Sequence, residues 1–130
     1  MSLPLLAILP GDPGGIGPEI AVASLKAREV RRVCTPLALG PKNVFWKAGW
    51  RSHISPLLNI PFSYKRFLCR PTAEGGKVSF EALSLAVRLA AKGVIKGMVT
   101  APISKEAWDL AKCRFLDQTE FLKAATGSRE

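Results

Sequence analysis

Apolar residues along the chain fall into short continuous runs that alternate with longer segments of helical spacing. The runs Leu5–Leu9 and Thr35–Gly40 are bounded by proline or glycine, a pattern typical of strands buried on both faces of a parallel sheet. Gly93–Ala101 is a third such run, and Phe62–Phe67 alternates apolar with polar residues. The pattern therefore predicts strands at these four places.

The segments between these runs predict helices. Pro18 suits the first turn of a helix, and the neighbouring Glu19 favours the positive helix end. Pro41 begins a second predicted helix over residues 41–50, and two more are predicted over Ser104–Lys112 and Thr119–Gly127. One face of the first helix is expected to consist of Ile20, Ala23, Ser24 and Ala27.

The clearest helical pattern lies between Gly75 and Gly93. Ser79 is expected to cap its start, and Gly93 is expected to stop it. Its apolar stripe is predicted to consist of Phe80, Leu83, Val87 and Ala90.

Strands that alternate with helices indicate βαβ units, so the predicted fold is α/β, with a parallel or mixed sheet flanked by helices. The last predicted helix meets Gly127, three residues before the end of the sequence. We therefore expect residues 1–130 to form a partial α/β unit.

Composition narrows the class of protein and of partner. Apolar residues make up 48% and charged residues 22% of the 130 residues, with a net charge of +9. This favours a globular domain. The charge is compatible with anionic partners, but the basic residues form no long block, so a solvated surface is the favoured explanation. No nucleic-acid motif is apparent. Three widely spaced cysteines favour reduced thiols and a cytoplasmic protein, and no membrane span or signal peptide is predicted.

Three segments could carry chemistry. The first is Gly11–Gly17, a glycine-rich loop after a predicted strand, with Asp12 as a candidate to line a cleft. Its glycine spacing fits neither G-x-G-x-x-G nor G-x-x-x-x-G-K-[ST], so it is either a structural turn or a ligand loop.

The second segment follows the strand that is predicted to end at Ala101. Thr100, Ser104 and Lys105 offer two hydroxyls and a cation where ligands gather in α/β proteins. A capped helix with a surface lysine explains the same residues.

The third segment begins the last predicted helix. Gln118 and Thr119 could point polar groups at the same cleft. A capping box between Asp117 and Glu120 explains the segment without a ligand.

Four motifs in order, Gly11–Glu19, Gly76–Ala90, Val99–Trp108 and Gln118–Leu122, resemble the 4-hydroxythreonine-4-phosphate dehydrogenase family. The resemblance implies one lobe of an isocitrate/isopropylmalate-dehydrogenase-like two-lobe architecture and a homodimer. It also implies oxidation and decarboxylation of 4-phosphohydroxy-L-threonine in pyridoxal phosphate biosynthesis, with NAD or NADP and a divalent metal. Relatives act on threonate or erythronate phosphates and on aromatic dihydrodiols.

By this resemblance, the substrate-contacting His-Thr pair of the family falls on Gln118 and Thr119. Glutamine can donate a hydrogen bond but cannot carry a proton near neutral pH. The metal-binding histidines of the family lie beyond residue 130, and His53, expected to be a surface residue, matches none of them. We therefore expect an N-terminal portion that is inactive alone, with no metal ligands and no assignable catalytic or cofactor-binding residues. The alternatives are a related dehydrogenase for another substrate and a non-catalytic anion-binding module.

Overall fold

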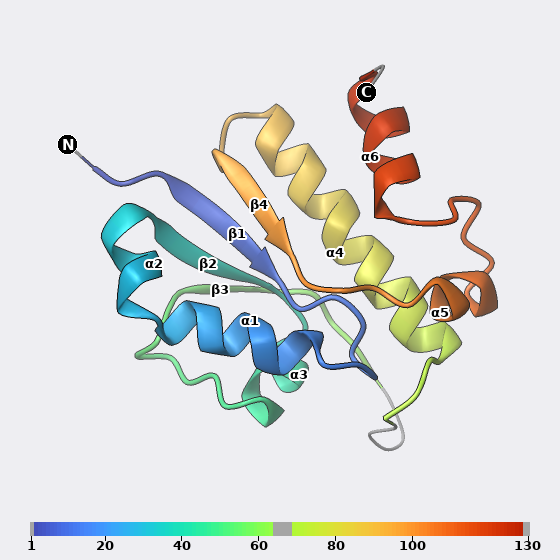
Figure 1. The fold of residues 1–130 in the computed structure, drawn as a ribbon, viewed down its shortest axis with the longest axis horizontal. Coiled ribbons are helices and arrows are strands. Elements are labelled where there is room, and N and C mark those ends of the chain that lie inside the picture. The colour runs from blue at the N-terminus through green and yellow to red at the C-terminus, as the bar shows by residue number, and fades with distance from the viewer. Residues whose placement is uncertain (1, 64–68, 129–130) are drawn as a thin grey trace.

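The computed structural model describes residues 2–63 and 69–128 and contains a four-stranded parallel sheet (Figure 1). The strands are β1 (Leu5–Leu9), β2 (Thr35–Gly40), β3 (Leu57–Asn59) and β4 (Gly97–Thr100), in the order β3-β2-β1-β4. The register pairs Leu5 with Thr35 and Leu6 with Gly97. The central strand β1 therefore has a parallel neighbour on each side.

Two of the four predicted strands, β1 and β2, have the predicted bounds. The third is shorter than Gly93–Ala101, because Gly93 has a φ of +76° and ends the preceding helix before the strand begins. Phe62 and Ser63 are not in a strand, and the rest of the Phe62–Phe67 prediction lies outside the described residues. The three-residue β3 was not predicted.

Helices cover both faces of the sheet (Figure 1). Ile8 packs with α1 (Gly17–Lys26) and α3 (Lys42–Lys47), whereas Ala7 and Leu9 pack with the helices of the other face. This alternation confirms the predicted sheet flanked by helices, buried on both sides. The remaining helices are α2 (Arg28–Val33), α4 (Ala73–Ala91), α5 (Lys105–Leu110) and α6 (Gln118–Thr126).

The predicted face of α1 is wrong. Ile20 is 46% exposed, whereas Ala21, Val22 and Leu25 are buried against the sheet. Gly17 and Pro18 at the helix start are also buried. The small residues Ala23 and Ala27 matched the apolar spacing without belonging to the core.

Helix α4 begins earlier than predicted, and its cap is Thr72 rather than Ser79. The Thr72 hydroxyl accepts a hydrogen bond from the Gly75 N–H at 2.9 Å. Ser79 is buried in the helix interior, where its Oγ accepts a hydrogen bond from Trp108 Nε1 at 2.9 Å and donates to the Gly76 carbonyl. Leu83 lies in the core as predicted, and α4 stops before Gly93.

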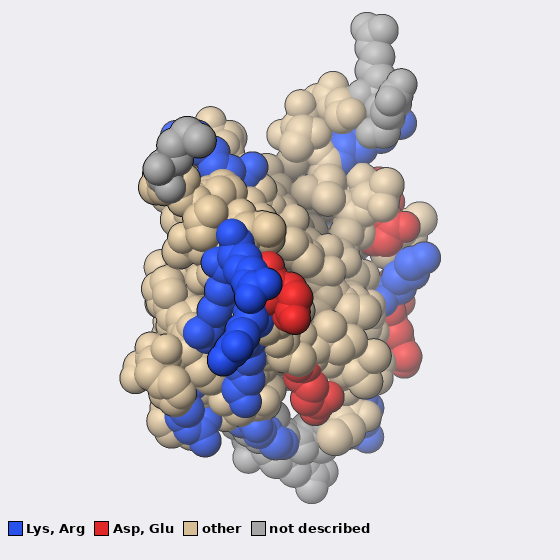
Figure 2. Space-filling view, turned by 60° about the vertical axis from the view of Figure 1, so that its left-hand side comes forward, with Lys and Arg blue, Asp and Glu red and all other residues tan. Residues whose placement is uncertain are grey.

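Basic side chains gather on the side of the molecule that carries α2, which is turned forward in Figure 2. Arg31 of α2 is not free for a partner, because it donates to the carbonyls of Leu25 and Ile54 at 3.0 and 2.8 Å. Over residues 2–63 and 69–128, no helix is both long and apolar enough to cross a membrane. Cys34, Cys69 and Cys113 are free thiols.

Candidate functional site

The glycine-rich loop after β1 is locked against the loop after β4. Gly11 has a φ of +70°, and a Cβ atom there would lie 2.2 Å from the Pro102 carbonyl oxygen. The Asp12 N–H donates to the same oxygen at 3.0 Å. A Cβ atom on Gly17 would lie 2.1 Å from the Pro10 oxygen and 3.1 Å from the Ala101 Cβ. The first two predicted site segments are therefore brought together at the carboxyl edge of the sheet, and the glycines make that approach possible.

Asp12 lies inside this junction and not on its surface. Its side chain faces the start of α4, where a Cβ atom on Gly75 would lie 3.1 Å from Asp12 Oδ1. Asp12 is 4% exposed, and Oδ1 has no hydrogen-bond partner within the described part of the chain. Burial raises the pKa of this carboxyl group, and a hydrogen bond from the Gly14 backbone opposes the rise. A buried, unpaired carboxyl oxygen can accept a hydrogen bond from a ligand or hold a proton itself.

The start of α5 matches the capped-helix alternative. The Ser104 hydroxyl accepts a hydrogen bond from the Ala107 N–H at 3.0 Å, so this hydroxyl caps the helix. The Lys105 side chain is 75% exposed, and its Nζ lies 3.9 Å from Asp117 Oδ2. Thr100 is the half-buried last residue of β4. Lys105 and Thr100 are therefore the residues of this segment whose polar groups are not used as a helix cap.

The start of α6 is a modified capping box. Asp117 Oδ1 accepts a hydrogen bond from the Glu120 N–H at 2.9 Å, and Glu120 Oε2 accepts one from the Leu116 N–H at 2.8 Å. The capping interpretation of these two acids is confirmed. Gln118 differs from them, because its Oε1 is buried and has no partner among residues 2–63 and 69–128. Thr119 beside it is exposed.

The predicted residues thus fall into two groups. Asp12 lies at the junction of the loops after β1 and β4 with the start of α4, and the Lys105–Asp117 ion pair joins the starts of α5 and α6. Thr72 and Gly75, which bring α4 beside Asp12, were not predicted as part of the site. The available signal was a threonine three residues before the Gly75-Gly76 pair, which is typical of a helix cap.

A divalent metal does not fit the residues that the structure describes. They contain no group of three His, Cys, Asp or Glu side chains placed to hold an ion. His53 is exposed, as predicted for a surface residue. A catalytic metal requires several converging oxygen or nitrogen ligands, so the described residues supply no metal-dependent step.

Comparison with known proteins identifies relatives along nearly the whole chain. The family model for the pyridoxal phosphate biosynthetic protein PdxA matches residues 20–130. A 4-hydroxythreonine-4-phosphate dehydrogenase from Desulfosudis oleivorans is 32% identical over 96% of this chain and 43% of its own length. A protein from Symbiobacterium thermophilum, described as a candidate D-threonate 4-phosphate dehydrogenase, is 30% identical over 98% of this chain and 44% of its own length.

The fold gives the same result. The crystal structure of a 4-hydroxythreonine-4-phosphate dehydrogenase from Burkholderia phymatum matches with a TM-score of 0.89 and 25% identity, over 100% of this chain and 46% of that one. The chain thus spans less than half the length of these relatives, with a dehydrogenase-like α/β fold. The chain belongs to the family of pyridoxal phosphate biosynthetic proteins known as PdxA.

Proposed function

We propose that residues 1–130 form the N-terminal part of an NAD(P)-dependent dehydrogenase that oxidises 4-phosphohydroxy-L-threonine. The relatives named for this activity, at about one third identity, support the substrate class. A phosphorylated small molecule is the expected partner, together with a second copy of the complete enzyme. The partial unit would supply one wall of a cleft between two lobes.

The observation that carries the proposal is the junction of the loops after β1 and β4. The 3.0 Å hydrogen bond from the Asp12 N–H to the Pro102 carbonyl fixes both loops beyond the carboxyl ends of parallel strands. This edge is where open α/β sheets bind their ligands. Asp12 would act from inside the junction, and Thr100 would contribute its hydroxyl from the end of β4.

Gln118 and Thr119 would contact the substrate from the start of α6. The unpaired Oε1 of Gln118 can accept a hydrogen bond from a substrate hydroxyl, while its amide can donate one to a phosphate. The Lys105 ammonium adds positive charge nearby, although Asp117 partly offsets it. These residues bind and orient; none of them transfers the hydride.

NAD or NADP would accept the hydride, and the family resemblance adds a divalent metal. Because the described residues hold no metal-ligand cluster, we assign no metal or cofactor contact to them. We therefore expect the chain to bind the phosphorylated substrate and to leave it unoxidised.

The test combines a titration with an assay on the purified 130-residue chain. Calorimetry with 4-phosphohydroxy-L-threonine should detect binding, whereas absorbance at the reduced-nicotinamide band should stay flat with NAD or NADP and Mg²⁺, Mn²⁺ or Zn²⁺. Thr119→Val should weaken binding about tenfold through loss of one hydrogen bond to a charged group. Thr126→Val, at the far end of the same helix, is the matched control and should bind normally.

The outcomes separate the alternatives. Absence of binding would contradict the proposal, and clear turnover would contradict the expected inactivity. Tighter binding of D-threonate 4-phosphate would favour the alternative of a related dehydrogenase with another substrate. The 30% identical relative and the glutamine at position 118 support that alternative. Equal binding of inorganic phosphate would favour a non-catalytic anion-binding module.

A further inference from the structure

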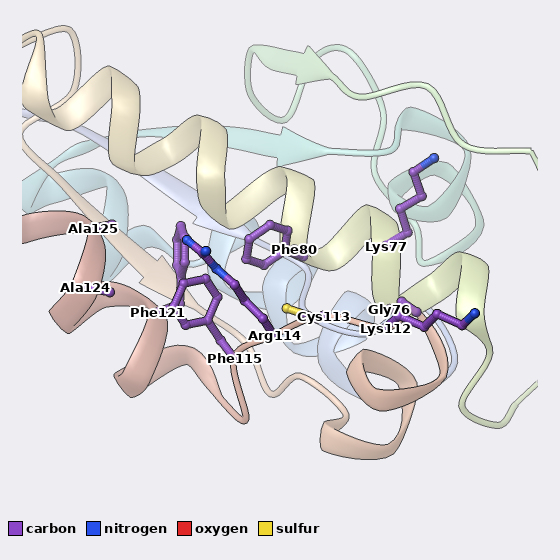
Figure 3. A pocket seen from close by; sticks show the side chains of 11 residues that line it. Gly76, Lys77, Phe80, Lys112, Cys113, Arg114, Phe115, Phe121, Ala124 and Ala125 are labelled. Carbon is purple, nitrogen blue, oxygen red and sulfur yellow. The ribbon is translucent and has the colours of Figure 1, made fainter.

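A cavity lies between α4 and α6 (Figure 3). It is enclosed by the first half of α4, the connection from α5 to α6, and α6 itself. Its volume is about 550 Å³, within the range of small-molecule sites. None of the residues assigned to the proposed substrate site lines it.

Three phenyl rings form the apolar wall of this cavity. The ring centroids of Phe80 and Phe121 are 4.8 Å apart, those of Phe115 and Phe121 5.2 Å, each pair at an angle of 70°. Phe80 also packs edge-on against Trp108 at 5.5 Å, and Trp108 is fully buried. The rings come from α4, the α5–α6 connection and α6, so the packing of these elements holds the wall in place before any ligand arrives.

The rim of the cavity is basic. Lys77, Lys112 and Arg114 line it, and its eleven lining residues, all in the described ranges, include no Asp or Glu. The Arg114 guanidinium carbon lies 4.9 Å from the centroid of Phe115, which places a cation directly beside the aromatic wall. None of the three cations forms an ion pair within the described part of the chain.

Lys112, on the rim, has an unusual backbone conformation. Its φ is 58°, and within the described residues it is the non-glycine residue with a positive φ. Lys112 ends α5: its N–H donates to the Asp109 carbonyl, and the Cys113 N–H donates to the Trp108 carbonyl, both at 2.9 Å. Glycine is the usual residue at this position of a helix end. Lys112 therefore holds a strained backbone conformation at the rim, and its ammonium group points away from the three rings (Figure 3).

We propose that this cavity binds a small aromatic anion, with its ring against the three phenylalanines and its phosphate or carboxylate at the basic rim. The wall favours a flat apolar body, and the Arg114 guanidinium beside it favours a negative head group, with Lys77 and Lys112 adding positive charge farther along the rim (Figure 3). This site is separate from the proposed substrate site, so it can be tested whether or not that site binds 4-phosphohydroxy-L-threonine.

Cys113 provides the readout, because its side chain lines the cavity and is a free thiol (Figure 3). The 130-residue chain is alkylated with iodoacetamide, and mass spectrometry follows Cys113 and the exposed Cys69 separately. The probe is phenyl phosphate; inorganic phosphate and benzyl alcohol at the same concentration represent the head group and the ring alone. Phenyl phosphate is expected to slow alkylation of Cys113 and not of Cys69, while the two partial probes leave both unchanged.

Variants test whether the basic residues at the rim cause the protection of Cys113 by phenyl phosphate. Arg114→Gln should weaken the affinity for phenyl phosphate about tenfold, whereas Lys123→Gln, which removes a charge from α6 outside the cavity, should leave it unchanged. Lys112→Gly should raise the melting temperature, because glycine adopts a positive φ without strain, and should weaken binding of phenyl phosphate, because a positive charge is lost. A purely structural role of Lys112 predicts the first effect and not the second. Equal protection by inorganic phosphate or by benzyl alcohol, no protection by phenyl phosphate, or an unchanged affinity in Arg114→Gln would overturn the proposal.

Discussion

The two ends of the proposed substrate site are held by different kinds of contact. At the loop after β1, backbone atoms approach so closely that Gly11 and Gly17 have no room for a Cβ atom. At the start of α6, local caps hold the chain, and Phe121 is the buried residue of the helix. The first end is therefore fixed by close backbone contacts between distant loops. The second is held by local caps and by the packing of Phe121 against Phe80 and Phe115.

The largest expected effect comes from filling the tight junction. Gly17→Ala would place a Cβ atom 2.1 Å from the Pro10 carbonyl oxygen. Backbone must then move, so the free energy of unfolding should fall by about 3 kcal/mol, at the upper end of typical overpacking. Urea denaturation measures this change.

Gly15→Ala in the same loop is the matched control. Its Cβ atom would meet only ordinary contacts, the nearest 3.6 Å away at the Asp12 carbonyl oxygen. Its stability should stay within about 0.5 kcal/mol of the native chain. Equal losses in the two variants would show that the junction is not fixed by steric contact.

A pH-dependent effect is expected from Asp12. Because burial raises the pKa of its carboxyl group, the folded chain holds this proton more tightly than the unfolded chain. The free energy of unfolding should therefore fall as pH rises from about 4, the ordinary value, through the raised pKa. Asp12→Asn should be more stable than the native chain at neutral pH, and the two should converge below about pH 4.

Urea denaturation across this pH range provides the measurement. Asp109→Asn on α5 serves as the matched carboxyl-to-amide control. A native chain whose stability rises steadily with pH relative to Asp12→Asn would contradict the assigned direction.

The smallest effects belong to α6. Asp117→Ala removes the cap of this helix and should cost about 1 kcal/mol, a typical value for a lost N-cap. Lys105→Ala removes only the exposed partner of the 3.9 Å ion pair and should cost less than about 0.5 kcal/mol. Hydrogen exchange should show that Asp117→Ala speeds exchange in α6 and leaves the loop after β1 protected. Faster exchange at both places would mean that the two ends are one cooperative unit.

The sequence predicted the fold where apolar runs are long and their boundaries are marked. The strands Leu5–Leu9 and Thr35–Gly40 have proline and glycine at their ends, and Ser104 and Asp117 are ordinary helix caps. Prediction failed for α2, whose six residues include three arginines and none that is buried, and for the three-residue β3. Both elements are too short to show a repeating pattern of apolar residues, so their secondary structure depends on tertiary contacts.

The meeting of the first two candidate segments was predictable, because carboxyl ends of parallel strands lie at one edge of a sheet. The burial of Asp12 was not predictable, since it depends on α4 approaching through Gly75, more than sixty positions later in the chain. Ser79 shows the same limit. Serine before an apolar stripe indicates a cap, and only the position of Trp108 shows that the hydroxyl serves the core.

The place of β1 in the sheet has a consequence for how the protein folds. β1 comes before both of its partners, β2 and β4, in the sequence, and Leu6 pairs with Gly97, which lies 91 positions later. Long loops must therefore close before the centre of the sheet is complete, which slows folding relative to a protein with local contacts. During synthesis on the ribosome, one edge of this apolar strand stays open until β4 has emerged.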